Sequence, residues 1–422
     1  MDSKTIEMVL LEQKEEMERK IQSSFCARRE ERLVNLDSNL AQIIMGVRRS
    51  GKSTMCFNLI KNSGKNFAYV NFDDERFEHL RSEDLNSILE CLYKVYGDFG
   101  NLFLDEVQNV DSWHLFVNRL LRQGIKLLIT GSNSKLLGGE LATHLTGRYM
   151  KTELYPFSFY EYCIFKGVGV ECSTTKQRGI ARAHFDMYLE EGGMPELFNE
   201  TRKTAYIDTL VGNIIANDIE HRYRIRYKAA FENIAQHILN NAPAVINYRR
   251  LGSEFDLSSS HTAENYVKFI GNAYLVAGIH RYASKSHTRI RDEKLYAIDV
   301  AFMNNRQDAF SGKNLGWRLE TIVCLELLRR YIPDGYDIYY YDTQSWEVDF
   351  VVCKGRDVKK LIQVCYDISS EKTLDREVRA LVNASGKTGC KDLLLLTMAD
   401  EATIEKGSLS IRMQPVYQWL LQ

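Results

Sequence analysis

The sequence contains little proline and no cysteine pattern typical of a disulfide or zinc framework. It has five prolines in 422 residues, so few rigid linkers mark its domain boundaries. Its nine cysteines are scattered, without a CxxC pair or a cysteine and histidine cluster at zinc spacing. This excludes a disulfide-rich secreted scaffold and a zinc finger, and we expect reduced thiols in a cytoplasmic protein.

Long apolar runs are also missing. No segment reaches the roughly 18 apolar residues that a membrane-spanning helix needs, so we expect no membrane insertion. Residues 1–21 carry charges on both sides of a short apolar stretch and lack the apolar core and cleavage site of a signal peptide. We expect an N-terminal charged surface helix within residues 1–30.

What the sequence does contain is the composition of a globular protein. Hydrophobic residues make up 45%, charged residues 26%, and the net charge is -1. These values exclude a disordered or collagen-like chain. Because a chain of 422 residues exceeds one ordinary core, several domains are expected.

Four short apolar runs, at residues 41–46, 67–72, 101–106 and 125–130, alternate with helical stretches. This alternation predicts an α/β domain with a parallel sheet covered by helices. From residue 319 a helix, three strands, a helix and a strand predict a second α/β domain. The expected domains are a nucleotide-binding core at 31–155, a helical lid at 156–227, a winged-helix-like domain at 228–295 and an α/β domain at 296–422.

The segment Gly46–Thr54 reads GVRRSGKST between a predicted strand and a predicted helix. A phosphate-binding loop needs glycines where backbone approaches oxygens, a lysine for the β- and γ-phosphates and a hydroxyl for Mg²⁺. This pattern therefore predicts binding of ATP with Mg²⁺. The expected nucleotide-binding residues are Gly46, Arg49, Ser50, Gly51, Lys52, Ser53 and Thr54, with Ser53 also a metal ligand.

The strand at 101–106 ends in Asp105 and Glu106. An aspartate at this place orients Mg²⁺ and a glutamate polarises the attacking water, so we expect ATP hydrolysis beyond binding. The next strand leads to Ser132 and Asn133, either of which is a candidate to sense the γ-phosphate. Arg148 in an exposed turn is suited to stabilise charge on the nucleotide of a neighbouring subunit; the alternative is an ordinary surface arginine.

The motifs GVRRSGKST, LFLDEVQNV, ITGSNSKLL, LTGRY, YPFSFYEY and EGGMPE, in this order, resemble a prokaryotic AAA-type P-loop ATPase family similar to signalling ATPases. The resemblance extends over nearly the whole chain and includes a C-terminal domain of unknown function. It implies that Lys52 and Ser53 bind phosphate and Mg²⁺, that Asp105 and Glu106 form the acidic pair and that Arg148 is an arginine finger. It implies no substrate beyond ATP.

The C-terminal part is similar in pattern to the PD-(D/E)xK nuclease fold, a restriction-endonuclease-like α/β fold. Asp349 matches an acidic position, and Glu320 on the preceding predicted helix is a candidate for an additional ligand. However, Gln363 is neutral and Cys365 stands where the lysine is needed to activate water. We expect this site to be degenerate. Lys372 is a candidate for a migrated lysine.

Residues 221–300 are locally basic, with twelve Lys or Arg against seven Asp or Glu. Arginines interleaved with aromatic residues suit nucleic acid, and a winged helix would place Lys268 on its recognition helix, with Lys285 and Arg289 near the wing. The alternative is a structural or protein-contact module.

Three functional hypotheses follow. The first is an ATPase acting as a nucleotide-driven switch on DNA or a protein partner. The second is an ATP-gated, metal-dependent nuclease. The third is a signalling or defence scaffold that forms homo-oligomers on ATP binding without touching nucleic acid.

Overall fold

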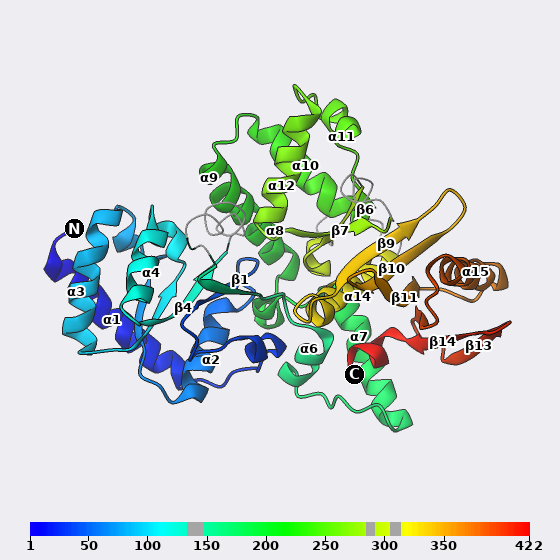
Figure 1. Ribbon diagram of the computed structural model, residues 1–422, viewed down its shortest axis with the longest axis horizontal. Coiled ribbons are helices and arrows are strands. Elements are labelled where there is room, and N and C mark those ends of the chain that lie inside the picture. Colours follow the sequence, from blue (N-terminus) through cyan, green and yellow to red (C-terminus); the bar gives the residue numbers. More distant parts are fainter. Residues whose placement is uncertain (133–144, 146, 284–291, 304–313) are drawn as a thin grey trace. The chain divides into compact units, whose positions relative to one another are not determined.

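The computed structural model describes residues 1–132, 145, 147–283, 292–303 and 314–422. The chain separates into two compact units (Figure 1). The first unit comprises residues 1–154 with 272–274, and the second comprises residues 155–271 and 275–422. Within the described residues, no helix has the length and apolar character needed to cross a bilayer.

A parallel sheet of five strands in the order β2-β3-β4-β1-β5 forms the centre of the first unit. The strands are β1 (Ala41–Met45), β2 (Ala68–Asn71), β3 (Asn101–Asp105), β4 (Lys126–Gly131) and β5 (Tyr149–Glu153). The four apolar runs in the sequence are β1 to β4, and the predicted α/β fold is confirmed. Because β4 lies between β1 and β3, the loops after these three strands meet at one edge of the sheet.

Four helices cover this sheet. They are α1 (Ser3–Ile21), α2 (Lys52–Ser63), α3 (Leu85–Tyr96) and α4 (Trp113–Arg122). On α1 the residues Ile6, Val9, Leu10 and Met17 are buried at helical spacing. The Gln13 side-chain amide donates to the Asn71 carbonyl and accepts from the Asn71 N–H, both at 3.0 Å. The N-terminal helix therefore belongs to the packed unit, because its apolar stripe outweighs the charge that led us to expect a surface helix.

Helices make up the first part of the second unit and also flank its strands. Within the described residues they are α6 (Phe159–Phe165), α7 (Thr175–Glu191), α8 (Lys203–Asn213), a π-helical turn (Ile214–Glu220), α9 (His221–Tyr223), α10 (Lys228–Asn241), α11 (Tyr248–Glu254), α12 (Ser260–Asn272), α14 (Leu315–Tyr331), α15 (Glu371–Thr388) and α16 (Val416–Leu420). The segment 156–227 is helical, as its periodicity indicates, but it is part of the second unit.

A mixed sheet in the order β13-β14-β12-β11-β10-β9-β7-β8-β6 runs through the second unit. Its strands are β6 (Ala244–Val245), β7 (Val276–Arg281), β8 (Glu293–Ala297), β9 (Asp337–Asp342), β10 (Glu347–Lys354), β11 (Asp357–Cys365), β12 (Leu393–Thr397), β13 (Ala402–Lys406) and β14 (Leu409–Pro415). The boundary expected between residues 295 and 296 falls inside β8. Since β7 also pairs with β9 at His280 and Tyr339, the segments on the two sides of that boundary share one sheet.

The EGGMPE motif packs too closely for any side chain larger than hydrogen at its glycines. A Cβ at Gly193 would lie 2.2 Å from the Phe157 carbonyl oxygen, and one at Gly192 would lie 1.8 Å from the Asp299 carboxylate. Asp299 accepts hydrogen bonds from the N–H groups of Gly193 and Ala301, each at 2.8 Å. The motif thus joins the helical segment to the start of the sheet region within the second unit.

Candidate functional site

The phosphate loop lies between the end of β1 and the start of α2. Gly51 takes the left-handed conformation (φ 93°) at the N-terminus of α2, where glycine is favoured. Lys52 is buried and its ammonium donates to the Val47 carbonyl at 3.2 Å. Among the described residues the buried Ser50 hydroxyl has no hydrogen-bond partner. The loop therefore presents a buried ammonium and an unsatisfied hydroxyl at a helix N-terminus, where an anion is favoured.

Asp105 connects this loop to β3 and β4. Its Oδ1 accepts from the Ser53 hydroxyl at 2.9 Å and from the Thr130 hydroxyl, and its Oδ2 accepts from the Tyr69 hydroxyl at 3.4 Å. The Thr130 hydroxyl in turn accepts from the Glu106 N–H at 3.0 Å. Sequence reasoning missed Thr130, although its position at the end of β4 was a usable signal.

The two acidic residues have different electrostatic environments. Burial raises the pKa of Asp105 to about 6, and the Glu106 carboxylate adds to the shift. Burial, the largest single cause, acts to raise the pKa of Glu106. The Lys52 ammonium, 3.7 Å away, the Gln108 and Ser132 hydrogen bonds and the Arg48 charge together outweigh it, so the pKa is lowered. The fold thus pushes the two pKa values apart, and Glu106 is the carboxylate that stays ionised, as a general base must.

Of the two sensor candidates, Ser132 is buried and its hydroxyl accepts from the Gln108 side-chain amide at 3.4 Å. The same amide donates to Glu106, so Gln108 links the two residues. Asn133 lies outside the described residues.

Arginines surround the loop on its other sides. Arg28, which sequence reasoning missed, is buried and donates to the Ser50 carbonyl at 3.0 Å. Arg48 pairs with Asp73 at 3.4 Å, while Arg49 is exposed in the left-handed conformation (φ 68°). Thr54 follows Ser53 on the first turn of α2.

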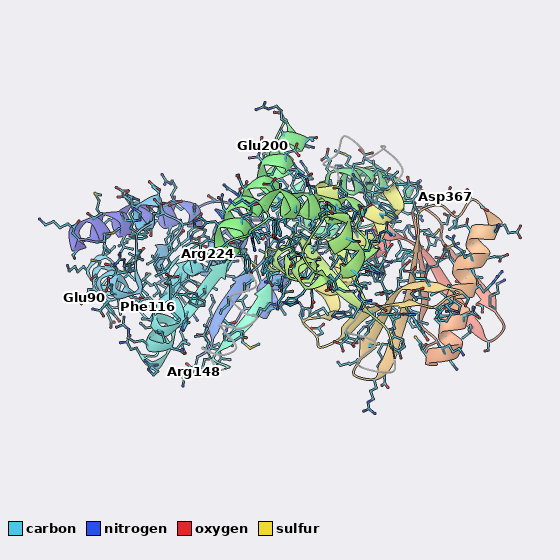
Figure 2. The ribbon with its side chains drawn as sticks, turned by 90° about the horizontal axis from the view of Figure 1, so that it is seen from above. Glu90, Phe116, Arg148, Glu200, Arg224 and Asp367 are labelled. Carbon is cyan, nitrogen blue, oxygen red and sulfur yellow. The ribbon has the colours of Figure 1, made fainter. Side chains whose placement is uncertain are left out.

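Arg148 lies at the opposite edge of the sheet from the phosphate loop. It precedes β5, whose first residue pairs with Ala41 at the start of β1, and its carbonyl accepts from the Ala41 N–H at 3.0 Å. The phosphate loop follows the other end of β1, roughly 13 Å along the strand. Arg148 is exposed (Figure 2), so it faces away from the nucleotide site of its own chain.

These residues fit ATP with Mg²⁺. The loop N–H groups and Lys52 would hold the phosphates, and the adjacent Ser53 hydroxyl and Asp105 carboxylate are hard oxygen ligands of the kind Mg²⁺ prefers. The unsatisfied Ser50 hydroxyl is a further donor facing this loop.

The nuclease-like residues gather at the ends of β10 and β11. The Asp349 carboxylate accepts from the Val364 N–H at 2.8 Å, and the Gln363 amide donates to Glu377 on α15 at 2.8 Å. Burial raises the pKa of the Cys365 thiol to about 11, so it is a neutral group at pH 7. A cavity of about 430 Å³ borders Asp349, Gln363 and Glu377.

This donor set does not fit a divalent metal. Within the described part of the chain, no three His, Cys, Asp or Glu side chains are grouped so that they could hold an ion. Lys372, the expected migrated lysine, is exposed on the first turn of α15. Glu320 instead forms an ion pair with Lys294 and accepts a hydrogen bond from Tyr296, both of which the sequence did not predict.

Of the expected DNA contacts, Lys268 is exposed on α12, whereas Lys285 and Arg289 lie outside the described residues. Tyr223 at the end of α9 stacks on Phe269 of α12 with ring centroids 3.9 Å apart. This stack places the basic segment 221–228 beside α12. Arg224 in that segment is exposed (Figure 2).

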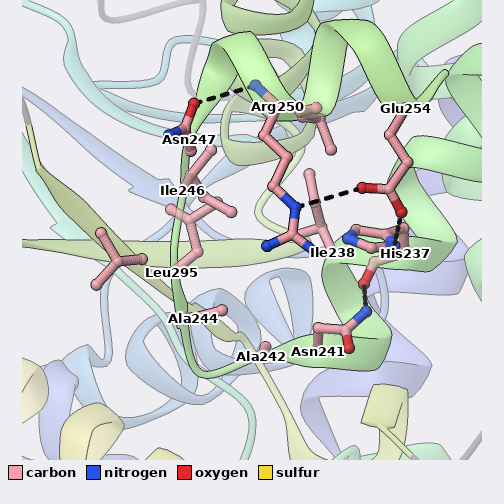
Figure 3. Close-up of a pocket in the computed structure, with 12 residues that line it drawn as sticks. His237, Ile238, Asn241, Ala242, Ala244, Ile246, Asn247, Arg250, Glu254 and Leu295 are labelled. Atoms are coloured by element: carbon pink, nitrogen blue, oxygen red, sulfur yellow. Dashed lines mark hydrogen bonds and ion pairs between the residues drawn. The ribbon is translucent and has the colours of Figure 1, made fainter.

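A second cavity, of about 250 Å³, lies between α10, α11 and β6 (Figure 3). Glu254 approaches both Arg250, at 3.8 Å, and His237, at 3.9 Å. The apolar side chains of Ile238 and Leu295 line it as well. Its charged groups thus already interact with one another.

Comparison with known proteins agrees with this geometry. A family model described as an AAA domain matches residues 38–163, and one for a domain of unknown function, DUF8612, matches residues 182–312. An uncharacterized protein of Methanocaldococcus jannaschii is 34% identical over 406 residues, covering 92% of this chain and 90% of the relative. An uncharacterized protein of Haemophilus influenzae is 29% identical over 408 residues, covering 92% of this chain and 95% of the relative.

Among solved structures, the replication initiator DnaA bound to AMPPCP and single-stranded DNA is 17% identical, with a TM-score of 0.26 over 57% of this chain and 85% of its own. The Thermotoga maritima RuvB Holliday junction branch migration motor is 14% identical, with a TM-score of 0.28 over 62% and 88%. Cdc6p from Pyrobaculum aerophilum is 13% identical, with a TM-score of 0.27 over 66% and 93%. Superpositions this weak say nothing of function.

Proposed function

The chain belongs to the AAA-type P-loop ATPase family, and on that premise we propose that it binds ATP with Mg²⁺ and hydrolyses the γ-phosphate. The observation that carries this proposal is the convergence of Lys52 and Ser53 with Asp105 and Glu106 at one edge of the parallel sheet. Binding alone would not need a carboxylate of lowered pKa beside the phosphate loop.

Each residue has a role in this chemistry. The loop N–H groups and Lys52 would hold the phosphates, and Ser53 and Asp105 would hold Mg²⁺. When bound, Mg²⁺ neutralises charge on the phosphate oxygens. Glu106 accepts a proton from the attacking water, while Gln108 and Ser132 orient its carboxylate.

The test is phosphate release from MgATP by the full chain, with Lys52→Ala as the inactive control. We expect turnover that Lys52→Ala abolishes together with ATP binding. A folded Lys52→Ala protein that hydrolyses ATP at the wild-type rate would contradict the proposal.

Arg148 completes the site in trans. Its exposure at the far edge of the sheet suits an arginine finger that reaches the nucleotide of an adjacent copy, so we propose an ATP-dependent homo-oligomer. The nine cysteines of the chain, all among the described residues, form no disulfide, which suits a reducing cytoplasm.

A second proposed function is DNA binding by the α10–α12 region, with nucleotide state in the first unit switching that contact. The supporting observation is the Tyr223–Phe269 stack, which brings Arg224 and Arg226 beside α12, where Lys268 is exposed. Exposed arginines and lysines near one helix suit phosphate contacts. Lys285 and Arg289 remain part of this hypothesis.

DNA affinity measured over a range of salt concentrations tests this second function. We expect Lys268→Glu to weaken binding and to reduce the salt slope by about one phosphate contact. Lys391→Glu, at an exposed lysine before β12, is the matched control. No binding at low salt, and no stimulation of ATP turnover by DNA, would favour a protein partner or the oligomeric scaffold.

A further inference from the structure

Lys294 lies among the acidic residues of the nuclease-like region. Its side chain comes from β8, and its ammonium is 2.9 Å from Glu320 on α14 and 2.8 Å from Glu347 on β10. Asp349, also on β10, is close enough to interact electrostatically with the same ammonium. The side chains of Lys294 and Glu320 are 9% and 14% exposed, so water screens this pair little, whereas Glu347 is 44% exposed.

One oxygen of the Glu320 carboxylate makes both of its contacts in this arrangement. This Oε1 forms the ion pair with the Lys294 ammonium and accepts a hydrogen bond from the Tyr296 hydroxyl at 2.7 Å. Lys294 and Tyr296 are two residues apart on β8, so both side chains point to the same face of the sheet. Two donors from one strand therefore converge on one oxygen of the helix carboxylate.

In a metal-dependent nuclease with this pattern, the helix carboxylate and the strand aspartate would bind a divalent cation. Here the charge at the same place is an ammonium bonded to two carboxylates. The strand position that should add a third acidic ligand is Gln363, whose amide is bonded to Glu377. A second cation beside Lys294 would meet direct charge repulsion.

We propose that the Lys294 ammonium replaces the divalent cation of the nuclease-like site and ties β8 to α14 and β10. The second unit then has no Lewis acid with which to cleave a phosphodiester. The ion pairs instead join the end of the α10–α12 segment to the C-terminal sheet, so the site holds these elements in register.

The experiment counts Mn²⁺ ions bound to the full chain without nucleotide, by electron paramagnetic resonance. Lys294→Met removes the ammonium and keeps most of the side-chain volume. Lys360→Met is the matched control, because Lys360 pairs with Asp392 at 2.9 Å on the neighbouring strands β11 and β12. The double variant Lys294→Met, Asp349→Asn shows whether a Mn²⁺ site gained by Lys294→Met depends on Asp349.

We expect Lys294→Met to gain one Mn²⁺ site, at least about tenfold tighter than any wild-type binding that depends on Asp349. The site should be absent in Lys360→Met and lost again in the Lys294→Met, Asp349→Asn double variant. Lys294→Gln takes the place of Lys294→Met if circular dichroism shows that the latter does not fold.

Two results would overturn the proposal. One is a folded Lys294 variant that gains no Mn²⁺ site. The other is a wild-type chain that already binds Mn²⁺ and loses it on Asp349→Asn, since Lys294 would then act beside a metal instead of replacing it. The second result needs no Lys294 variant and so can be obtained whatever its stability.

Discussion

Asp105 and Glu106 follow one another in the chain, but they have opposite surroundings. Asp105 is 5% exposed and receives neutral hydroxyl donors, whereas Glu106 lies 3.7 Å from a buried ammonium. Glu106 also adopts a left-handed conformation (φ 51°), which turns its side chain away from the strand direction. Asp105 is therefore suited to bind a metal ion, and Glu106 is suited to accept a proton.

The pH dependence of stability tests the Asp105 environment. The pKa of Asp105 is raised from 3.8 to about 6, so the folded state favours the protonated carboxyl. The stability that this gives is fully present below pH 3.8 and is lost as pH rises past about 6. Asp105→Asn keeps an oxygen acceptor for Ser53 and Thr130. At pH 7.5 it should raise the free energy of unfolding by about 3 kcal/mol.

Melting temperatures at pH 4 and pH 7.5 check this prediction. The difference between Asp105→Asn and wild type should be several degrees at pH 7.5 and close to zero at pH 4. Asp98→Asn, at an exposed position of the same unit, is the control. A stabilisation that is equal at both pH values would show that ionisation of Asp105 is not its cause.

At the residue level the sequence predicted the site residues that lie within one continuous motif. Lys52 and Ser53 belong to such a motif, and its spacing indicates their roles toward phosphate and Mg²⁺. Thr130, Arg28 and Lys294 were not predicted, because each acts on a residue more than twenty positions away. Only Thr130 carried a sign of its contact, by its position at the end of a predicted strand; a lone arginine or lysine carries none.

At the level of elements, the position of β4 between β1 and β3 explains the site. This order brings the ends of three strands together, so that Thr130 on β4 reaches Asp105 on β3. The apolar runs predicted these strands but not their order, since period and length say nothing of which strands are neighbours. In the second unit β13 and β14 were not predicted, although apolar and polar residues alternate along β14.

Arg28 supports the phosphate loop from the segment before β1. It donates to the Ser50 carbonyl, which belongs to the same peptide unit as the Gly51 N–H of the loop. A hydrogen bond from a charged donor of this kind contributes about 1.5 to 3 kcal/mol to stability. Arg28→Met should therefore weaken ATP affinity by at least about tenfold. Titration calorimetry measures the ATP affinity of each variant, with Arg122→Met on the exposed side of α4 as the control. Unchanged affinity in a folded variant would mean that the loop holds its shape without Arg28.

At the scale of the whole molecule, the placement of Arg148 separates catalysis within one chain from catalysis between chains. The arginine and the phosphate loop lie at opposite ends of the strand pair β1 and β5. In the proposed oligomer, Arg148 would therefore act on the nucleotide of another chain and not on that of its own.

Mixing two inactive variants tests this arrangement. Arg148→Ala keeps the complete phosphate loop, and Glu106→Gln keeps the arginine, so each should have little activity alone. A mixture should recover part of the wild-type rate, because some interfaces then join an intact loop to an intact Arg148. A mixture whose activity is only the sum of its two components would contradict catalysis in trans.

The most direct test of the whole account is single-turnover hydrolysis of ATP by Glu106→Gln beside wild type, with ATP affinity measured on both. We predict that Glu106→Gln binds MgATP with nearly wild-type affinity and hydrolyses it roughly 10² to 10⁴ times more slowly, because the carboxylate of lowered pKa that accepts the proton is gone. Hydrolysis by Glu106→Gln at the wild-type rate would contradict the assignment of Glu106 and with it the proposed ATPase mechanism.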